Sequence, residues 1–247
     1  MTDEVLEEET AEEMTAQSRK RPAGYRIMKG AILGLAALLV ILGCVYAGRR
    51  LIRKYGRGHK TMDGFYIDLD RENIPERGNG QQYIAIHYLG VVGENHHIEP
   101  SGVGAHFYIY YDGTIYQSAD LDAVVWQVGP GSSGYAQIHP EARNANTIGI
   151  ELCVKCDGDP ADAKDPTWYF TEETQEAAVK LVRRLMAEMD IPISHVLRHG
   201  DIVDKWCPAP YLLNNSYESS WTWDEFLAAV NDLPEEEVPA YPIVSEP

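Results

Sequence analysis

An uninterrupted apolar run constrains this chain more than any other feature. Residues 30–48, GAILGLAALLVILGCVYAG, contain no charged side chain. At ~1.5 Å of rise per residue, a helix of this run is about as long as the ~30 Å hydrocarbon core of a bilayer. A helix on the surface of a soluble domain has a polar face, which this run lacks. We therefore expect a single transmembrane helix over residues 27–48.

The charges around the run do not orient it in a membrane. Basic side chains lie on both sides, so the positive-inside rule gives no direction. They are Arg19, Lys20, Arg21, Arg26 and Lys29 before the run, and Arg49, Arg50, Arg53 and Lys54 after it. A cleaved signal peptide is disfavoured by the long charged segment ahead of the run. Lipoprotein processing at Cys44 is a second alternative, although Leu42 fits such a site poorly.

Charge also divides the rest of the chain. Residues 1–26 begin with an acidic stretch and turn basic, and this composition predicts a disordered tail. We interpret residues 49–62 as a basic juxtamembrane linker, residues 63–232 as a folded domain, and the acidic, proline-rich residues 233–247 as a disordered tail. From Thr61 onward, 10 lysines and arginines stand against 31 aspartates and glutamates. Because so acidic a domain repels nucleic acid, we expect no nucleic-acid partner.

The domain carries the patterns of both strands and helices. Residues 83–88 and 147–154 are short apolar runs typical of buried strands. Residues 105–117 predict a hairpin around Asp112-Gly113. Apolar side chains from Ala178 to Met189 recur at helical spacing, and Thr222 with Glu225 forms the capping box of a second helix. These elements predict an α/β domain, with a central mixed β-sheet flanked by helices.

Three side chains have the chemistry of metal ligands. His87 ends an apolar strand, where a polar ring needs a partner, while His199 and Cys207 share one loop that Pro208 stiffens. Catalytic zinc typically takes three such ligands and keeps a fourth position for water. The compact motif HExxH is absent. Spacing alone leaves two interpretations open: a metal site, or a core histidine, a turn histidine and a buried thiol.

Five segments in order carry a family resemblance: YIAIHYLG, AHFYIYYDGTIYQ, VVWQVGPGS, NTIGIELCV and RHGDIVDKWCPAP. Together they resemble the zinc-dependent N-acetylmuramoyl-L-alanine amidases of the type-2 family, which is related to peptidoglycan recognition proteins. The resemblance covers roughly residues 74–230. It implies a mixed sheet with a zinc cleft along one side, and zinc (Zn2+) held by His87, His199 and Cys207.

The resemblance also implies two catalytic residues. Glu151 matches the acid of a family strand, where burial should raise its pKa and suit it as the general base for the attacking water. Lys205 would stabilise the developing oxyanion. The alternatives are a salt-bridged strand acid and a solvated loop lysine. Ala105 stands where some relatives have a tyrosine. A tyrosine therefore does not assist the transition state at this position, and we expect Glu151 and Lys205 to carry the catalytic roles.

Other polar residues near these motifs leave open choices. His106 either lines the cleft or packs as a strand histidine. Trp126 and Gln127 occupy a cleft segment of the family and could contact glycan or stem peptide, although a buried tryptophan is the commoner outcome. His96 and His97 follow the first strand, and we do not expect them to be ligands.

The expected function is that of a membrane-anchored zinc hydrolase that cleaves the amide bond between N-acetylmuramic acid and L-alanine in peptidoglycan. Because this substrate lies outside the cytoplasmic membrane, we expect a single-pass protein with an extracytoplasmic catalytic domain. The alternative is a catalytically inactive peptidoglycan receptor on the same fold, which the presence of Cys207 disfavours. A further alternative is a membrane-anchored redox protein or scaffold that uses Cys153 and Cys156.

Overall fold

The computed structural model describes residues 32, 34–44, 59–74, 76–78, 80–129 and 134–245. The chain falls into two units, Met1–Tyr55 and Gly56–Pro247. In the first unit, residue 32 and residues 34–44 are helical, and their large apolar side chains are exposed. Within the described ranges, no helix is both long and apolar enough to cross a membrane. The rest of the predicted span over 27–48, the predicted tail over 1–26 and residues 49–58 of the linker lie outside the described residues.

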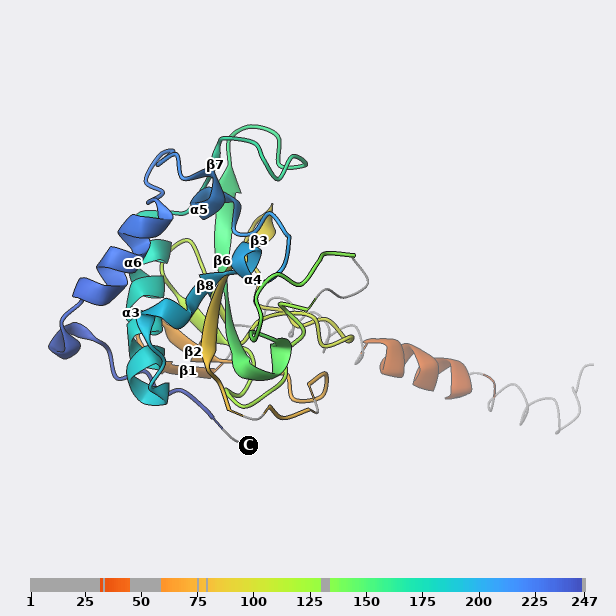
Figure 1. The fold of residues 1–247 in the computed structure, drawn as a ribbon. Coiled ribbons are helices and arrows are strands. Elements are labelled where there is room, and N and C mark those ends of the chain that lie inside the picture. Colours follow the sequence, from red (N-terminus) through yellow and green to blue (C-terminus); the bar gives the residue numbers. More distant parts are fainter. Residues whose placement is uncertain are drawn as a thin grey trace, which may run out of the picture. The chain divides into compact units, whose positions relative to one another are not determined.

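The second unit is built on one mixed β-sheet (Figure 1). Its strand order is β1-β2-β5-β4-β6-β3-β8, and β7 pairs with β6. The strands are β1 (His59–Met62), β2 (Phe65–Ile67), β3 (Tyr83–Val92), β4 (Phe107–Ile109), β5 (Ile115–Gln117), β6 (Thr147–Cys156), β7 (Trp168–Tyr169) and β8 (Val196–Arg198). Strand β3, next to the edge strand β8, runs parallel to both β6 and β8, whereas β4 and β5 form the predicted antiparallel hairpin.

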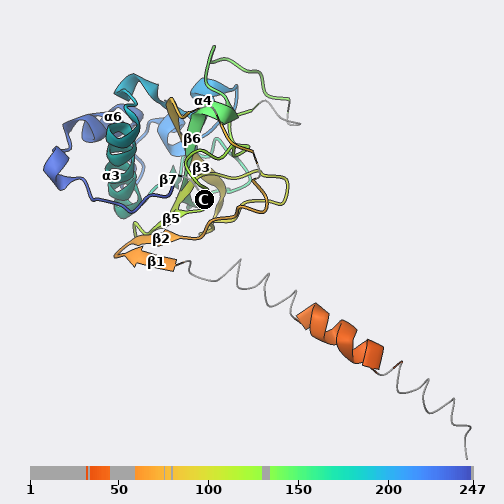
Figure 2. The same ribbon diagram turned by 90° about the horizontal axis from the view of Figure 1, so that it is seen from below.

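Helices flank this sheet, as the sequence predicts. They are α3 (Glu172–Met189), α4 (His199–Ile202), α5 (Ala209–Leu213) and α6 (Trp223–Asp232), with the 3-10 turns η1 (Asn144–Asn146), η2 (Ile193–His195) and η3 (Glu235–Glu237). Both ribbon views show α3 and α6 side by side (Figures 1 and 2). The fold class expected from the sequence, a mixed sheet flanked by helices, is therefore confirmed.

The main core lies between the sheet and α3 with α6. Ile84 and Ile86 from β3 pack in one apolar cluster with Leu181 of α3 and Phe226 of α6. Both helices begin at a threonine cap: the side-chain oxygens of Thr171 and Thr222 each accept a backbone N–H of the first turn, and the cap at Thr222 is the predicted one. Helix α3 forms because its apolar residues recur at helical spacing and so share one buried face.

The opposite face of β3 carries the residues of functional interest. Ala85 belongs to a second cluster with Ile202 of α4 and Val203, so it points away from α3. Side chains alternate along a strand, which places His87 on the same face as Ala85. The parallel register then sets His87 directly opposite Glu151 of β6. One face of the sheet thus builds the core, and the other presents the predicted site residues.

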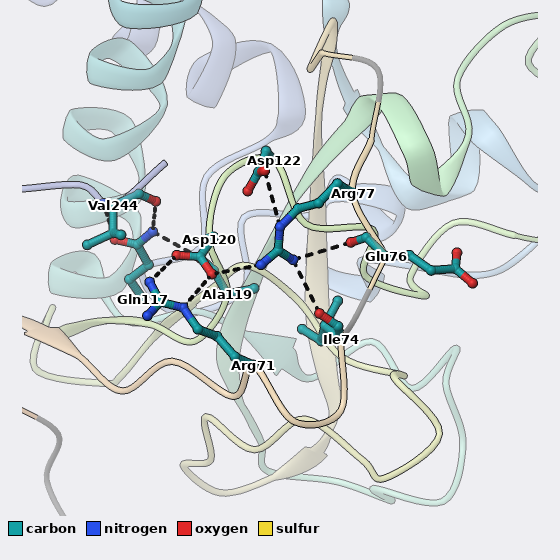
Figure 3. Close-up of polar contacts among 9 residues, drawn as sticks. All are labelled: Arg71, Ile74, Glu76, Arg77, Gln117, Ala119, Asp120, Asp122 and Val244. Carbon is teal, nitrogen blue, oxygen red and sulfur yellow. Dashed lines mark hydrogen bonds and ion pairs between the residues drawn. The ribbon is translucent and has the colours of Figure 1, made fainter. Parts of the chain in front are cut away.

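A buried carboxylate anchors the segment that precedes β3 (Figure 3). The Asp120 side chain is only 1% exposed and accepts two hydrogen bonds of 2.8 Å from the Arg71 guanidinium. Arg77 adds an ion pair to Asp120 at 3.6 Å and another to Asp122 at 3.2 Å. Because both arginines lie in the chain before β3, this network holds that segment to the loop after β5.

The chain after α6 returns to the sheet. Gln117 at the end of β5 donates to the carbonyl of Val244 at 2.6 Å and accepts the Val244 N–H at 2.9 Å (Figure 3). Tyr241 is buried and stacks on Phe65 with ring centroids 5.0 Å apart. Composition predicted disorder for residues 233–247, but the structure places 233–245 against the domain. Apolar side chains among the acids and prolines, Leu233, Tyr241 and Ile243, pack against the main core and hold this segment in place.

Candidate metal centre

Three buried side chains converge beside the middle of β3, where the neighbouring strand β8 ends. The ligand atoms of His87, His199 and Cys207 all lie within 4.8 Å of one another. The two imidazole rings are 4.5 Å apart between centroids, at an interplanar angle of 60°. Cys207 Sγ lies 3.9 Å from His87 Nδ1. The structure thus brings together all three residues that the sequence predicted as metal ligands.

Strand pairing places the two histidines. β8 pairs with β3 in parallel, and Ile86 lies opposite Arg198 in that register. The residues that follow are His87, in the middle of β3, and His199, which comes directly after β8 as the first residue of α4. Helix α4 begins there, and Asp201 stabilises its start by accepting hydrogen bonds from the backbone and guanidinium of Arg198. The pairing of β3 with the end of β8 thus brings the two rings together. The expectation that His87 ends its strand is wrong, because β3 continues to Val92.

A close approach of two backbone segments brings Cys207 back to the two rings. The Gly200 N–H donates to the Cys207 carbonyl at 2.7 Å, which folds the loop onto α4. A Cβ on Gly200 would lie 2.8 Å from the Lys205 carbonyl oxygen and 3.1 Å from that of Cys207. Glycine at this position is therefore what allows a ligand eight positions after His199 to return to it.

The chemistry of this group fits a zinc ion. Both ring nitrogens of His199 are buried and have no hydrogen-bond partner among the described residues. Burial, with a smaller effect of Lys205, lowers the pKa of His199 to about 3, and burial also lowers the pKa of His87. Both imidazoles therefore stay neutral, which is the form that binds metal. Two imidazoles and a thiolate are typical zinc ligands.

The pKa of the Cys207 thiol is shifted away from the metal-binding form, the thiolate. Burial, and then the charge of Glu151, raise its pKa to about 12, while Lys205 lowers it. Since zinc binds the thiolate, metal binding at this site must displace the thiol proton.

Glu151 lies next to the metal centre, as predicted. Its Oε1 is 4.0 Å from His87 Nδ1, and its side chain is 19% exposed. Oε2 is buried and has no hydrogen-bond partner among the residues described. Burial raises the pKa of Glu151 to about 8, and the positive charge of Lys205 opposes this shift. The predicted direction of the pKa is therefore confirmed, and the carboxylate is not held in a salt bridge with Lys or Arg among the described residues.

Lys205 is the lysine whose positive charge acts on the metal-ligand residues and on Glu151. Its side chain is partly buried, and its charge influences the pKa values of His87, His199 and Glu151 as well as Cys207. The structure thus places Lys205 where its charge acts on the whole centre. Its role in catalysis stays a prediction.

The structure decides several choices that the sequence left open. His106 is fully buried: its Nδ1 accepts the Gly149 N–H and its Nε2–H donates to the Ala123 carbonyl, both at 3.0 Å. It is therefore a packed strand histidine. Trp126 is 53% exposed, so the expectation of a buried tryptophan is wrong. Gln127 contacts the metal-ligand histidine itself, a position that the sequence analysis did not anticipate.

The cysteines and histidines considered above as alternatives, Cys153, Cys156, His96 and His97, are not part of the metal-ligand group found among the described residues. Cys153 is buried and Cys156 partly buried, and both are free thiols. His96 is buried, stacks on Tyr116 and hydrogen-bonds to Asp68 and Tyr110, which accounts for both of its ring nitrogens.

Comparison with known proteins gives a consistent family match. Residues 69–210, more than half of the chain, match the family Amidase_2, N-acetylmuramoyl-L-alanine amidase. The chain is 26% identical over 196 residues to the N-acetylmuramoyl-L-alanine amidase CwlH of Bacillus subtilis (strain 168), a match that covers 75% of this chain and 68% of CwlH. The N-acetylmuramoyl-L-alanine amidase XlyA of the same organism is 31% identical over 119 residues, which are 48% of this chain and 31% of XlyA.

Solved structures also align with part of this chain. The catalytic domain of XlyA is 27% identical, with a TM-score of 0.44 over 66% of this chain and 98% of that domain. The catalytic domain of PlyG is 19% identical, with a TM-score of 0.48 over 67% of this chain and 93% of that domain. The chain therefore spans about two thirds of CwlH, about a third of XlyA and nearly all of these catalytic domains.

Proposed function

Because the chain belongs to the Amidase_2 family of N-acetylmuramoyl-L-alanine amidases, we propose that it hydrolyses the amide bond between N-acetylmuramic acid and L-alanine in peptidoglycan. The observation that carries this proposal is the complete group of His87, His199 and Cys207, with Glu151 4.0 Å from His87 Nδ1. A peptidoglycan receptor that only binds its ligand needs neither three metal ligands nor a carboxylate with a raised pKa beside them.

Each residue then has a distinct task. His87 and His199 would hold zinc through ring nitrogens and Cys207 through Sγ, and the bound ion would polarise the scissile carbonyl and favour deprotonation of the attacking water. Glu151 accepts the proton of that water and returns it to the leaving amine. Burial raises the pKa of Glu151 to about 8 in the metal-free protein, while the charge of Lys205 opposes this shift and a bound cation would lower the pKa further, toward the range in which a carboxyl can both accept and return a proton. The positive charge of Lys205 stabilises the negative charge that develops on the carbonyl oxygen.

Replacement of the proposed base tests this mechanism. We expect Glu151→Gln to keep its zinc but to lose about 10²–10⁴-fold in turnover, because an amide cannot accept the water proton. The assay is digestion of purified peptidoglycan, with mass analysis of the released peptides and a parallel measurement of zinc content. Glu188→Gln is the matched control, since Glu188 pairs with Arg184 on the surface of α3.

Two outcomes of this assay would contradict the proposal. Full activity of the Glu151→Gln protein would show that another group takes the proton. A wild-type protein that holds no zinc and releases no peptide, with or without chelator, would instead support the inactive-receptor alternative.

We also propose that a single membrane helix over residues 27–48 anchors the chain with its catalytic unit outside the cytoplasm. The support is the charge-free run at residues 30–48 and the location of peptidoglycan outside the cytoplasmic membrane. Protease treatment of intact cells stripped of their wall tests the orientation. Digestion of the second unit is expected, and its protection in intact cells would refute this topology.

A further inference from the structure

One side chain connects a metal ligand to the backbone of the neighbouring strand. Gln127 Oε1 lies 3.2 Å from His87 Nε2. The other ring nitrogen of His87, Nδ1, is the one that faces Cys207. Gln127 Nε2 lies 2.5 Å from the backbone carbonyl of Thr147, the first residue of β6. A chain of hydrogen bonds therefore runs from a fixed backbone carbonyl, through an amide side chain, to the imidazole of His87.

This chain of hydrogen bonds determines which nitrogen of His87 carries the proton. The Thr147 carbonyl can only accept, so the amide nitrogen of Gln127 must face it, and the amide oxygen must face His87. An oxygen acceptor requires a proton on His87 Nε2. The lone pair then lies on Nδ1, the nitrogen 3.9 Å from Cys207 Sγ and 4.0 Å from Glu151. The arrangement therefore presents the ligating nitrogen to the other groups of the metal centre.

Asn144 holds the backbone of Gln127, and Gly149 leaves space for its side chain. The Asn144 side-chain oxygen accepts the backbone N–H of Gln127 at 3.0 Å and that of Val128 at 2.7 Å. The Gln127 side chain itself crosses β6 over Gly149. A Cβ on Gly149 would overlap Gln127 Oε1 and would lie 2.6 Å from its Cδ. The absence of a side chain at position 149 therefore provides the space that the amide occupies.

We propose that Gln127 is a positioning residue of the metal centre, which fixes the ring orientation and tautomer of His87, and that Gly149 is required because it admits this side chain. Partners that hydrogen-bond to the second nitrogen of a metal-ligating histidine typically contribute 10–100-fold to metal affinity. The inference rests on the zinc site of the proposed function. It concerns metal binding, and it holds whether or not the protein cleaves peptidoglycan.

The first test replaces the amide by an apolar side chain of similar length. We expect Gln127→Met to lower zinc affinity about 10–100-fold, measured on the full chain by competition with a chromogenic chelator. Nitrogen NMR of the protein with its zinc removed should show His87 protonated at Nε2 in the wild type and a tautomer mixture in the variant. Gln117→Met is the matched control, because Gln117 is also a buried amide bonded to backbone carbonyls and does not touch a metal ligand.

The second test uses Gly149 to displace Gln127 without changing it. Gly149→Ala should weaken zinc binding about as much as Gln127→Met, because the new methyl group takes the place of the amide. In a Gln127→Ala background the same Gly149→Ala change should weaken zinc binding by less than about 3-fold, since no amide is left to displace.

Three results would overturn the proposal. They are unchanged zinc affinity in Gln127→Met, an unchanged His87 tautomer in that variant, and a Gly149→Ala effect that is equally large in both backgrounds. None of these measurements depends on amide hydrolysis. An inactive enzyme with the expected zinc affinities would therefore refute the proposed function and leave this inference standing.

Discussion

Lowering the pH should destabilise the domain through one histidine that lies outside the metal-ligand group. The neutral ring of His106 accepts the Gly149 N–H at Nδ1 and donates from Nε2 to the Ala123 carbonyl. A second proton would place two N–H groups against each other at Nδ1, inside the sheet. Burial, opposed by the Ala123 hydrogen bond, lowers the pKa of His106 to about 4 from a usual value of 6.5.

The sign and size of the effect follow from these two pKa values. Because the folded-state pKa is the lower one, the unfolded chain takes up the proton first as the pH falls. The free energy of unfolding is therefore fully retained above about pH 6.5 and declines toward pH 4. Between about pH 8 and pH 5.5 the His106 contribution to this loss is about 1.4 kcal/mol, and it approaches about 3.4 kcal/mol well below pH 4.

Urea unfolding of wild type and His106→Gln at about pH 8 and pH 5.5 isolates this contribution. Chelator must be present, because zinc binding introduces its own pH dependence. Glutamine keeps an acceptor and a donor but does not titrate, so the variant should lose about 1.4 kcal/mol less than the wild type over this interval. An identical pH-dependent loss in both proteins would refute the account of His106 as a buried neutral base.

Three further substitutions should have separable effects. Gly200→Ala should lower zinc affinity about 10-fold or more in a chelator competition, because its Cβ would displace the Lys205 carbonyl; unchanged affinity would show that the loop adapts freely. Asp120→Asn should lower the free energy of unfolding, measured in urea, by about 1–3 kcal/mol because it weakens the hydrogen bonds from Arg71. An unchanged free energy of unfolding would show that this pair contributes nothing. Gln117→Met should lower the free energy of unfolding by about 1–2 kcal/mol and expose the chain around Val244 to proteolysis. Unaltered cleavage would show that other contacts hold this segment to the sheet.

The sequence by itself determined the main strands and helices and, through the family resemblance, the residues of the metal centre. Short apolar runs and helical spacing are local patterns, so they predicted the strands at 83–88 and 147–154 and the helical segment from Ala178 to Met189, which is part of α3. Residue type made His87, His199 and Cys207 candidate ligands, and the resemblance of the five ordered segments to the type-2 amidases then singled them out. The raised pKa of Glu151 was also predictable, since an acid within an apolar strand is removed from water.

Only the tertiary structure decided how these residues are supported. Gln127 reaches His87 from a loop 40 positions away, and only the space over Gly149 allows it, a contact that no local pattern records. The exposure of Trp126 and the packing of His106 likewise depend on which strands pair and in which register. A sequence shows which side chains are present and how nearby ones alternate. The partners of a buried amide or ring nitrogen are chosen when distant segments meet, and that happens only in the folded chain.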